Sequence, residues 1–220
     1  MTVISLLDRL ETKGTVYVTV GDELIGKNAA ENFQISKNEW KKLTSEHVIT
    51  VGMPLSEELY RDISSAGERT KAVRLGASIT SGSDKSASAV MRKLRDAGIS
   101  KESAEHAVAL LIRRGYIDEV AQCERIADTL LRYKRYGRGR IVQYLIAHGY
   151  PADAAKKAAA SLDDEDVCAA LTKTVEKKYP DIDKYSPADT KKAVASLMRL
   201  GFTSSEIFAE IRRIQKNKNR

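Results

Sequence analysis

A short pattern that occurs three times constrains the fold of this chain more than any other feature. A leucine is followed four residues later by a glycine and then by another apolar residue, within Leu94–Ile99, Leu145–Tyr150 and Leu197–Phe202. The glycines stand at positions 98, 149 and 201, so successive copies are 149 − 98 = 51 and 201 − 149 = 52 residues apart. A glycine can take the left-handed conformation that ends a helix, and the apolar residue after it packs back on that helix. The spacing therefore predicts a tandem repeat of helices.

The same frame continues downstream of each glycine. Apolar residues recur with helical spacing at matching positions of all three copies: Ala104, Ala155 and Ile207; Val108, Ala159 and Ile211; Leu111, Leu162 and Ile214. Each copy is expected to bury its apolar face partly on its neighbours. We predict a mainly α protein of three tandem three-helix repeats, residues 56–116, 117–162 and 163–216, in an elongated curved array. The alternative is a compact bundle whose helix–glycine–helix corners merely look alike.

The first 50 residues differ from the rest because they contain strand signals. Thr15–Val20 is β-branched or aromatic at every position, which is typical of a strand. A turn at Gly21-Asp22 would return the chain into a second strand over residues 23–26, and Phe33–Ile35 indicates a third. Residues 1–50 are thus predicted to form a small β-containing N-terminal lobe that is too small to be stable alone and packs on the helical body.

The balance of charges favours a polyanionic partner. The chain has 37 Lys and Arg against 30 Asp and Glu, which gives a formal net charge of +7. A surface of this kind suits DNA, RNA or an acidic protein face. A small domain can also carry such a charge for solubility alone.

No catalytic or metal-binding pattern is recognisable in the sequence. It has no GxxxxGK[ST] phosphate loop, no GxSxG and no HExxH. Cys123 and Cys168 are isolated and the three histidines are scattered, so we expect buried cysteines, no metal site and a reducing cytoplasm. The chain shows no signal peptide and no run of ~20 apolar residues, so a membrane is not an expected partner. We predict a cytoplasmic protein without catalytic residues, metal or cofactor, which is not an enzyme.

The candidate site is a basic turn between two predicted helices. It carries five basic side chains and two tyrosines and no acidic residue, and we call it the basic elbow: Arg132, Tyr133, Lys134, Arg135, Tyr136, Arg138 and Arg140. Gly137 and Gly139 are expected to let the backbone approach a ligand closely. Basic side chains interleaved with aromatic ones bind single-stranded nucleic acid, and they also suit an acidic protein surface. The alternative is a solvated cationic corner with both tyrosines in the core.

Several segments together resemble the RecX family of regulatory proteins, which modulate the RecA recombinase. They are Gly115-Tyr116-Ile117-Asp118-Glu119, Tyr136-Gly137-Arg138-Gly139, Leu145 with Gly149-Tyr150, and Leu200-Gly201-Phe202 with Ile207. The resemblance extends from about Ala66 to Arg213. It implies a bacterial, all-helical protein of three three-helix repeats that takes part in homologous recombination, DNA repair and the SOS response.

The resemblance also implies a function and partners. A RecX-like chain is expected to bind the RecA filament on single-stranded DNA, as a monomer, without enzymatic activity. It would mostly inhibit the ATPase, strand-exchange and coprotease activities of RecA. The family offers no sharply shared set of site residues, so the basic elbow remains the candidate site.

Two other classes of function compete with this one. A stand-alone nucleic-acid-binding helical protein, such as a helix-turn-helix repressor, would place polar base-reading side chains on its recognition helix. The helix after Gly149 is mostly alanine, Ala152 to Leu162, which disfavours that class and indicates packing. A hydrolase or nuclease would need a nucleophile, a base or a metal arrangement that the sequence does not offer.

Overall fold

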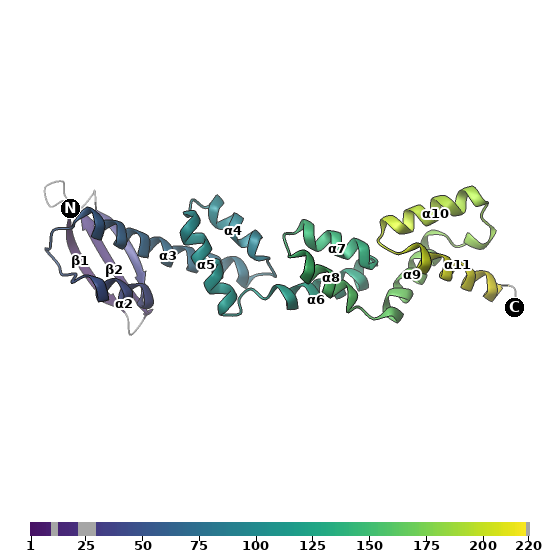
Figure 1. Ribbon diagram of the computed structural model, residues 1–220, viewed down its shortest axis with the longest axis horizontal. Helices are drawn as coiled ribbons and strands as arrows, with labels where there is room; N and C mark the ends of the chain where they lie inside the picture. Colours follow the sequence, from purple (N-terminus) through teal and green to yellow (C-terminus); the bar gives the residue numbers. More distant parts are fainter. Residues whose placement is uncertain (10–12, 22–29, 219–220) are drawn as a thin grey trace. The chain divides into compact units, whose positions relative to one another are not determined.

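The computed structural model describes residues 1–9, 13–21 and 30–218. The described chain is mainly helical and begins with a small antiparallel sheet, as predicted (Figure 1). It divides into two compact units. Unit 1 comprises Met1–Asp84 and Val90–Ile117, and unit 2 comprises Lys85–Ala89 and Asp118–Arg220. Each unit is described by itself below.

The sheet of unit 1 contains three antiparallel strands in the order β1-β2-β3: β1 (Thr2–Arg9), β2 (Thr15–Gly21) and β3 (Glu31–Ser36). Val16, Val18 and Val20 alternate along the central strand and are almost fully buried, because every second side chain of a strand faces the same side. Helices α2 (Lys37–Glu46) and α3 (Glu57–Ser81) lie against that face (Figure 1). The predicted packing of the lobe on the helical body is therefore confirmed.

The predictions for the strands had mixed outcomes. The strands around Thr15–Val20 and Phe33–Ile35 are confirmed as β2 and β3. Strand β1 was not predicted, because it lies at the edge of the sheet and most of its side chains are at least partly exposed. The strand expected over residues 23–26 lies outside the described residues.

The remaining helices of unit 1 pack around α3. Helix α4 (Ala87–Asp96) buries Val90 and Leu94, and α5 (Lys101–Arg113) runs against α3. Gly76 permits this approach, since a Cβ at Gly76 would lie 2.6 Å from Cδ1 of Leu111. The start of α5 is fixed by the Glu68 carboxylate of α3, which accepts hydrogen bonds from the Ser100 amide at 2.9 Å and the Ser103 hydroxyl at 2.7 Å. Burial raises the pKa of Glu68, but these hydrogen bonds outweigh it and hold that pKa below its ordinary value.

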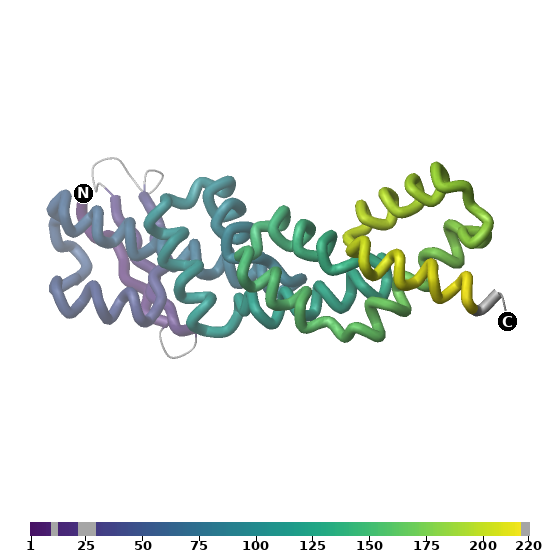
Figure 2. The backbone as a smooth tube through the Cα atoms, turned by 45° about the vertical axis from the view of Figure 1, so that its right-hand side comes forward, coloured from purple at the N-terminus to yellow at the C-terminus, as the bar shows by residue number. Residues whose placement is uncertain are grey.

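Unit 2 contains the other six α-helices of the described chain. They are α6 (Glu119–Thr129), α7 (Arg138–Ala147), α8 (Ala152–Ala160), α9 (Asp164–Lys178), α10 (Pro187–Arg199) and α11 (Ser204–Lys218). A π-helical turn, η2 (Leu130–Lys134), extends α6, and a 3-10 turn, η3 (Ile182–Lys184), precedes α10. One continuous core runs from Cys123 on α6 to Ile211 on α11. Helices α10 and α11 diverge from a sharp corner at Gly201 (Figure 2).

The three predicted corners have the same geometry. Gly98, Gly149 and Gly201 have φ of +79°, +84° and +94°. In each corner the amide after the glycine donates to the leucine carbonyl four residues before the glycine, at 3.1, 3.1 and 3.4 Å. This is the Schellman ending of a helix. Leu94, Leu145 and Leu197 are all fully buried, as are Ala104, Ala155 and Ile207 at the matching downstream positions. Each predicted repeat range contains three α-helices, and the division of the chain into three repeats remains a prediction.

One predicted core residue is on the surface. Cys123 is buried as expected, whereas Cys168 is exposed because it lies on the outer face of α9, beside the buried Val167. Tyr116 is likewise 54% exposed, while its neighbour Ile117 is buried. In both cases the adjacent residue occupies the inward position. The alanine-rich helix does pack as predicted, with Ala155, Ala158 and Ala159 buried.

Candidate binding sites

The basic elbow begins where α6 ends in an unusual turn. Residues Leu130–Lys134 form one turn of π-helix, a rare conformation that often occurs at functional sites. Arg135 follows with φ of 54°, and its amide donates to the Leu131 carbonyl at 3.1 Å. In the described part of the chain, Arg135 is the only residue other than glycine with a positive φ. A left-handed non-glycine residue is strained, so the surrounding structure holds it in place.

The two glycines of the elbow have a different role from the predicted one. Gly137 and Gly139 were expected to let the backbone approach a ligand. Instead their amides donate to the carbonyls of Leu200 at 2.8 Å and Gly201 at 3.0 Å. A Cβ at Gly137 would lie 2.4 Å from the carbonyl carbon of Gly201. The prediction was wrong because the close approach is between α7 and the corner before α11.

Arg138 is bound within the fold. Its side chain donates to the carbonyls of Ala159 at 3.1 Å and Leu162 at 2.6 Å. It also forms ion pairs with Asp164 at 2.6 Å and Glu206 at 3.5 Å, and it is only 26% exposed. This guanidinium links α7 to three other helices of unit 2. Its contacts support a structural role and leave it little capacity for a partner.

The other elbow side chains are more accessible. Tyr133 is 80% exposed, and Lys134 and Arg140 are exposed as well. Arg132 is exposed and pairs with Asp128 at 2.7 Å, a surface ion pair of the kind that a partner can displace. Tyr136 packs against the core of unit 2, and the Arg140 guanidinium lies 5.8 Å from the centroid of its ring. The surface available for binding is therefore formed by Arg132, Tyr133, Lys134, Arg135 and Arg140.

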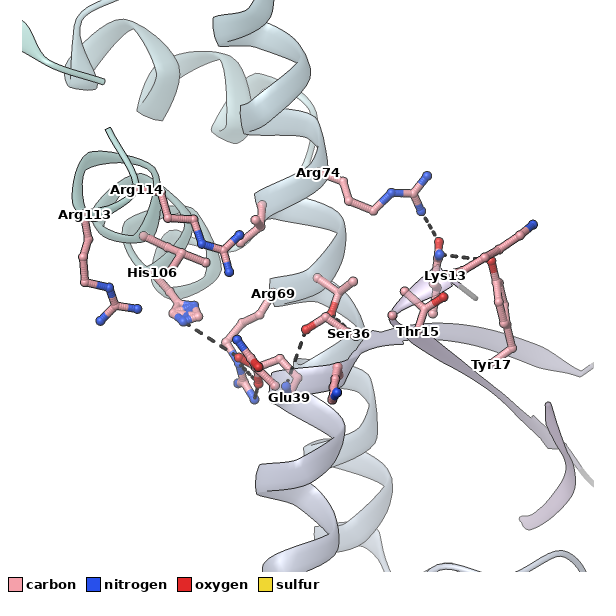
Figure 3. Close-up of a pocket in the computed structure, with 17 residues that line it drawn as sticks. Lys13, Thr15, Tyr17, Ser36, Glu39, Arg69, Arg74, His106, Arg113 and Arg114 are labelled. Carbon is pink, nitrogen blue, oxygen red and sulfur yellow. Dashed lines mark hydrogen bonds and ion pairs between the residues drawn. The ribbon is translucent and has the colours of Figure 1, made fainter. Parts of the chain in front are cut away.

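A second candidate site lies in unit 1 and has no counterpart among the sequence predictions. It is a cavity of about 700 Å³ between β2, β3, the start of α2, α3 and the end of α5, and we call it the basic pocket (Figure 3). Its cationic lining residues are Lys13, Lys37, Arg69, Arg74, Arg113 and Arg114, with His106 beside them. Glu39 is its only carboxylate among the described residues.

Some of these charges are already paired. The Glu39 carboxylate accepts from Arg69 at 2.7 Å and lies 3.8 Å from His106 (Figure 3). Arg74 donates to the Gln34 side chain, which donates in turn to the Tyr17 hydroxyl at 3.1 Å. Within the described residues, the remaining four cations form no ion pair: Lys13, Lys37, Arg113 and Arg114. The pocket therefore has a strong excess of uncompensated positive charge.

The Ser36–Glu39 spacing is a local sequence signal at the edge of this pocket. It predicts a capping box, in which the Glu39 side chain bonds back to the Ser36 amide. The Ser36 hydroxyl does accept from the Glu39 amide, at 3.5 Å. The Ser36 amide, however, donates to the Thr70 hydroxyl at 2.9 Å, and the Glu39 carboxylate turns to Arg69. Only half of the predicted box is formed, because α3 supplies both alternative partners.

Two kinds of feature are absent from the described residues. No group of three or more His, Cys, Asp or Glu side chains in the described ranges is arranged to hold a metal ion. None of the helices that the structure describes combines the length and the apolar character needed to span a membrane.

Comparison with known proteins gives a clear result at the level of structure. No family model matches the sequence, and no curated protein matches it. A crystal structure of a regulatory protein RecX superposes with a TM-score of 0.71 over 98% of both chains, at 17% identity. RecX from Lactobacillus salivarius superposes with a TM-score of 0.61 over 66% of this chain and 96% of that one, at 20% identity. The chain has the RecX fold.

The RecX fold explains the segments that carry the sequence resemblance. Leu145, Tyr150 and Phe202 are buried, and the glycines at 115, 149 and 201 have positive φ. These residues form helix corners. They therefore identify the fold without marking a binding surface, and the two basic sites rest on their own geometry.

Proposed function

We propose that this chain is a non-enzymatic regulator that binds the RecA recombinase, or its filament on single-stranded DNA. It lowers the ATPase, strand-exchange and coprotease activities of RecA in a bacterial cytoplasm. The observation that carries the proposal is the match to a regulatory protein RecX over 98% of both chains. A match of that extent includes the sheet as well as every helix, so it concerns the whole architecture and not one common helical motif.

The accessible part of the basic elbow is the surface that we assign to this interaction. It combines one largely exposed aromatic ring, Tyr133, with the exposed cations Lys134 and Arg140. Aromatic and arginine side chains are enriched where interfaces contribute most to binding. Basic side chains around them increase the association rate with a negatively charged filament. The surrounding structure holds Arg135 at its left-handed φ, and this fixes the turn that carries these side chains.

The test measures RecA ATPase on single-stranded DNA with increasing amounts of this protein. We expect suppression that saturates, and no effect at saturating protein would refute the proposal. The paired variant Lys134→Ala with Arg140→Ala should suppress less. Its matched control is Lys156→Ala with Lys157→Ala, which removes two exposed charges from α8 of the same unit. Equal loss in both pairs would show that only net charge matters, and no loss in either would move the interface away from the elbow.

The alternative function is a stand-alone nucleic-acid-binding protein, and the basic pocket favours it. This alternative predicts binding to bare single-stranded DNA together with an unchanged RecA ATPase. The RecA ATPase titration separates the two functions, because only the first predicts suppression. Binding of labelled DNA in the absence of RecA does not separate them, since it can accompany either function.

A further inference from the structure

We propose that the basic pocket of unit 1 is a separate binding site for the sugar-phosphate backbone of single-stranded nucleic acid. This goes beyond the proposed function, because the site needs neither RecA nor the basic elbow. Its ligand is recognised by charge and by hydrogen-bond donors, so we expect little preference for sequence.

The charge of the pocket is the first argument. Among the described lining residues, six Lys and Arg side chains stand against the single carboxylate of Glu39, which leaves a net of five positive charges. Glu39 is already satisfied by Arg69, so it does not neutralise the rest. Lys13 precedes β2 and Lys37 begins α2. Arg113 and Arg114 come from the end of α5 (Figure 3). When these cations neutralise a phosphodiester, counterions condensed on the nucleic acid are released, and this release supplies most of the sequence-independent affinity.

A buried hydroxyl is the second argument. Thr15 is only 8% exposed and lines the pocket, yet its Oγ1 has no hydrogen-bond partner among the described residues. The same holds for Nδ1 of His106 on the opposite side of the pocket. Buried polar atoms are nearly always paired in folded proteins. Both atoms are covered by neighbouring groups, so a phosphate or sugar oxygen would accept from the Thr15 hydroxyl only after a small shift of the lining. Tyr17, which also lines the pocket, offers a ring for a base.

The chemistry of the lining favours nucleic acid over an acidic protein segment. Protein interfaces depend on apolar and aromatic anchors that fill buried pockets. Among the described lining residues, the larger apolar groups are the side chains of Val73 and Leu110 and the ring of Tyr17. Four arginines provide planar donor pairs that match phosphate oxygens. The recess also suits one strand, whereas a duplex is read by elements that project into its grooves.

The experiment measures fluorescence anisotropy of a short labelled oligothymidylate with the full chain, without RecA, at several salt concentrations. The test variant is Lys37→Ala with Arg114→Ala, which removes two unpaired pocket cations. The control is Arg92→Ala with Lys93→Ala, two exposed cations of α4 that do not line the pocket. We expect the test pair to weaken binding severalfold. The slope of log K against log salt should flatten by about 1.4, at ~0.7 per lost contact to a single strand.

A third variant, Thr15→Val, tests the buried hydroxyl without changing charge. Since that hydroxyl has no partner in the described structure, its removal should leave the thermal midpoint unchanged or raise it, while oligothymidylate binding falls. A hydroxyl with only a structural role would change the midpoint and not the binding.

Three results would overturn the proposal. They are no binding of the wild-type chain to oligothymidylate, a test pair that binds like the control pair, and equal competition by polyglutamate, which would assign the pocket to acidic protein. None of these results depends on the RecA ATPase measurement. The pocket and the proposed function can therefore fail independently.

Discussion

The contact between Gly137 and Gly201 allows one prediction to be worked through quantitatively. Gly201 has φ of +94°, and a Cβ added to it would lie 2.1 Å from the Arg140 amide nitrogen and 2.7 Å from the Gly137 carbonyl oxygen. Backbone atoms cannot rotate away from the new methyl as a flexible side chain can. Gly201→Ala should therefore force apart α7 and the α10–α11 corner.

Two control variants separate the causes of this destabilisation. Gly98 has φ of +79° and nothing within 4 Å of its ideal Cβ, so Gly98→Ala measures backbone strain alone. We expect it to cost about 1 kcal/mol, from ~1–2 kcal/mol of left-handed strain less ~0.4–1 kcal/mol of reduced freedom in the unfolded chain. Gly137 has φ of −73°, so Gly137→Ala measures steric overlap alone, at about 1–3 kcal/mol.

Gly201→Ala combines both effects. It also strains the hydrogen bonds that the Gly137 and Gly139 amides donate to the carbonyls of Leu200 and Gly201, each of which contributes about 0.5–1.5 kcal/mol. We expect about 3–5 kcal/mol in total, a large share of the stability of a small domain. Urea unfolding followed by far-ultraviolet circular dichroism measures it, and fluorescence of the single tryptophan, Trp40, reports on unit 1 for the Gly98 control. A Gly201→Ala chain no less stable than Gly98→Ala would refute the packing argument. In the double variant Gly137→Ala with Gly201→Ala, both methyls would open the same contact between α7 and the corner before α11. Their costs should therefore be less than additive.

Three further predictions concern the core and the titratable groups of unit 2. Leu145→Asp should unfold unit 2, because an unpaired charge would replace a fully buried side chain at a cost of several kcal/mol; an unchanged thermal transition would show that the repeat alignment is wrong. Burial raises the pKa of Glu210, but hydrogen bonds and the charge of Arg213 outweigh it and hold that pKa below its ordinary value. The resulting stability is present above pH ~4.5 and lost as the pH falls through the folded-state pKa, so Glu210→Gln should flatten the acid limb of a stability–pH curve. Burial, assisted by two nearby glutamates, raises the pKa of Cys123 to about 11, so a thiol reagent at pH 8 should label Cys168 quickly and Cys123 only after unfolding; equal rates would contradict the buried position.

The helix corners could be predicted because their determinants are local. A Schellman ending depends on one glycine, the apolar residue after it and a residue four positions before it, so a repeated pattern of six residues carries the whole motif. The same reasoning located strand β2, whose β-branched and aromatic run is short and continuous. In the structure, Val16, Val18 and Val20 of this strand are buried on one face.

The binding sites could not be predicted to the same extent, because their determinants are distant in sequence. The basic pocket gathers residues from Lys13 to Arg114, and no window of the sequence contains more than a few of them. In the elbow, Arg138 and Gly137 are engaged by groups more than 20 and more than 60 residues away, at Ala159 and Gly201. A run of basic residues shows where charge is concentrated, whereas tertiary contacts determine which of those charges remain available.

Arg135 shows how the elbow differs from the other helix ends of this chain. Gly98, Gly115, Gly149 and Gly201 each take the left-handed position after a helix, where a glycine has no steric cost. Arg135 takes a comparable position after the π-helical turn at φ of 54°, where an L-residue carries about 1–2 kcal/mol of strain. A glycine there would relieve the strain and make the corner like the rest. An arginine in its place keeps a cation next to Lys134 and the exposed ring of Tyr133 at the cost of this strain. A purely structural corner would not need that charge, and this supports the elbow as the binding surface that we propose.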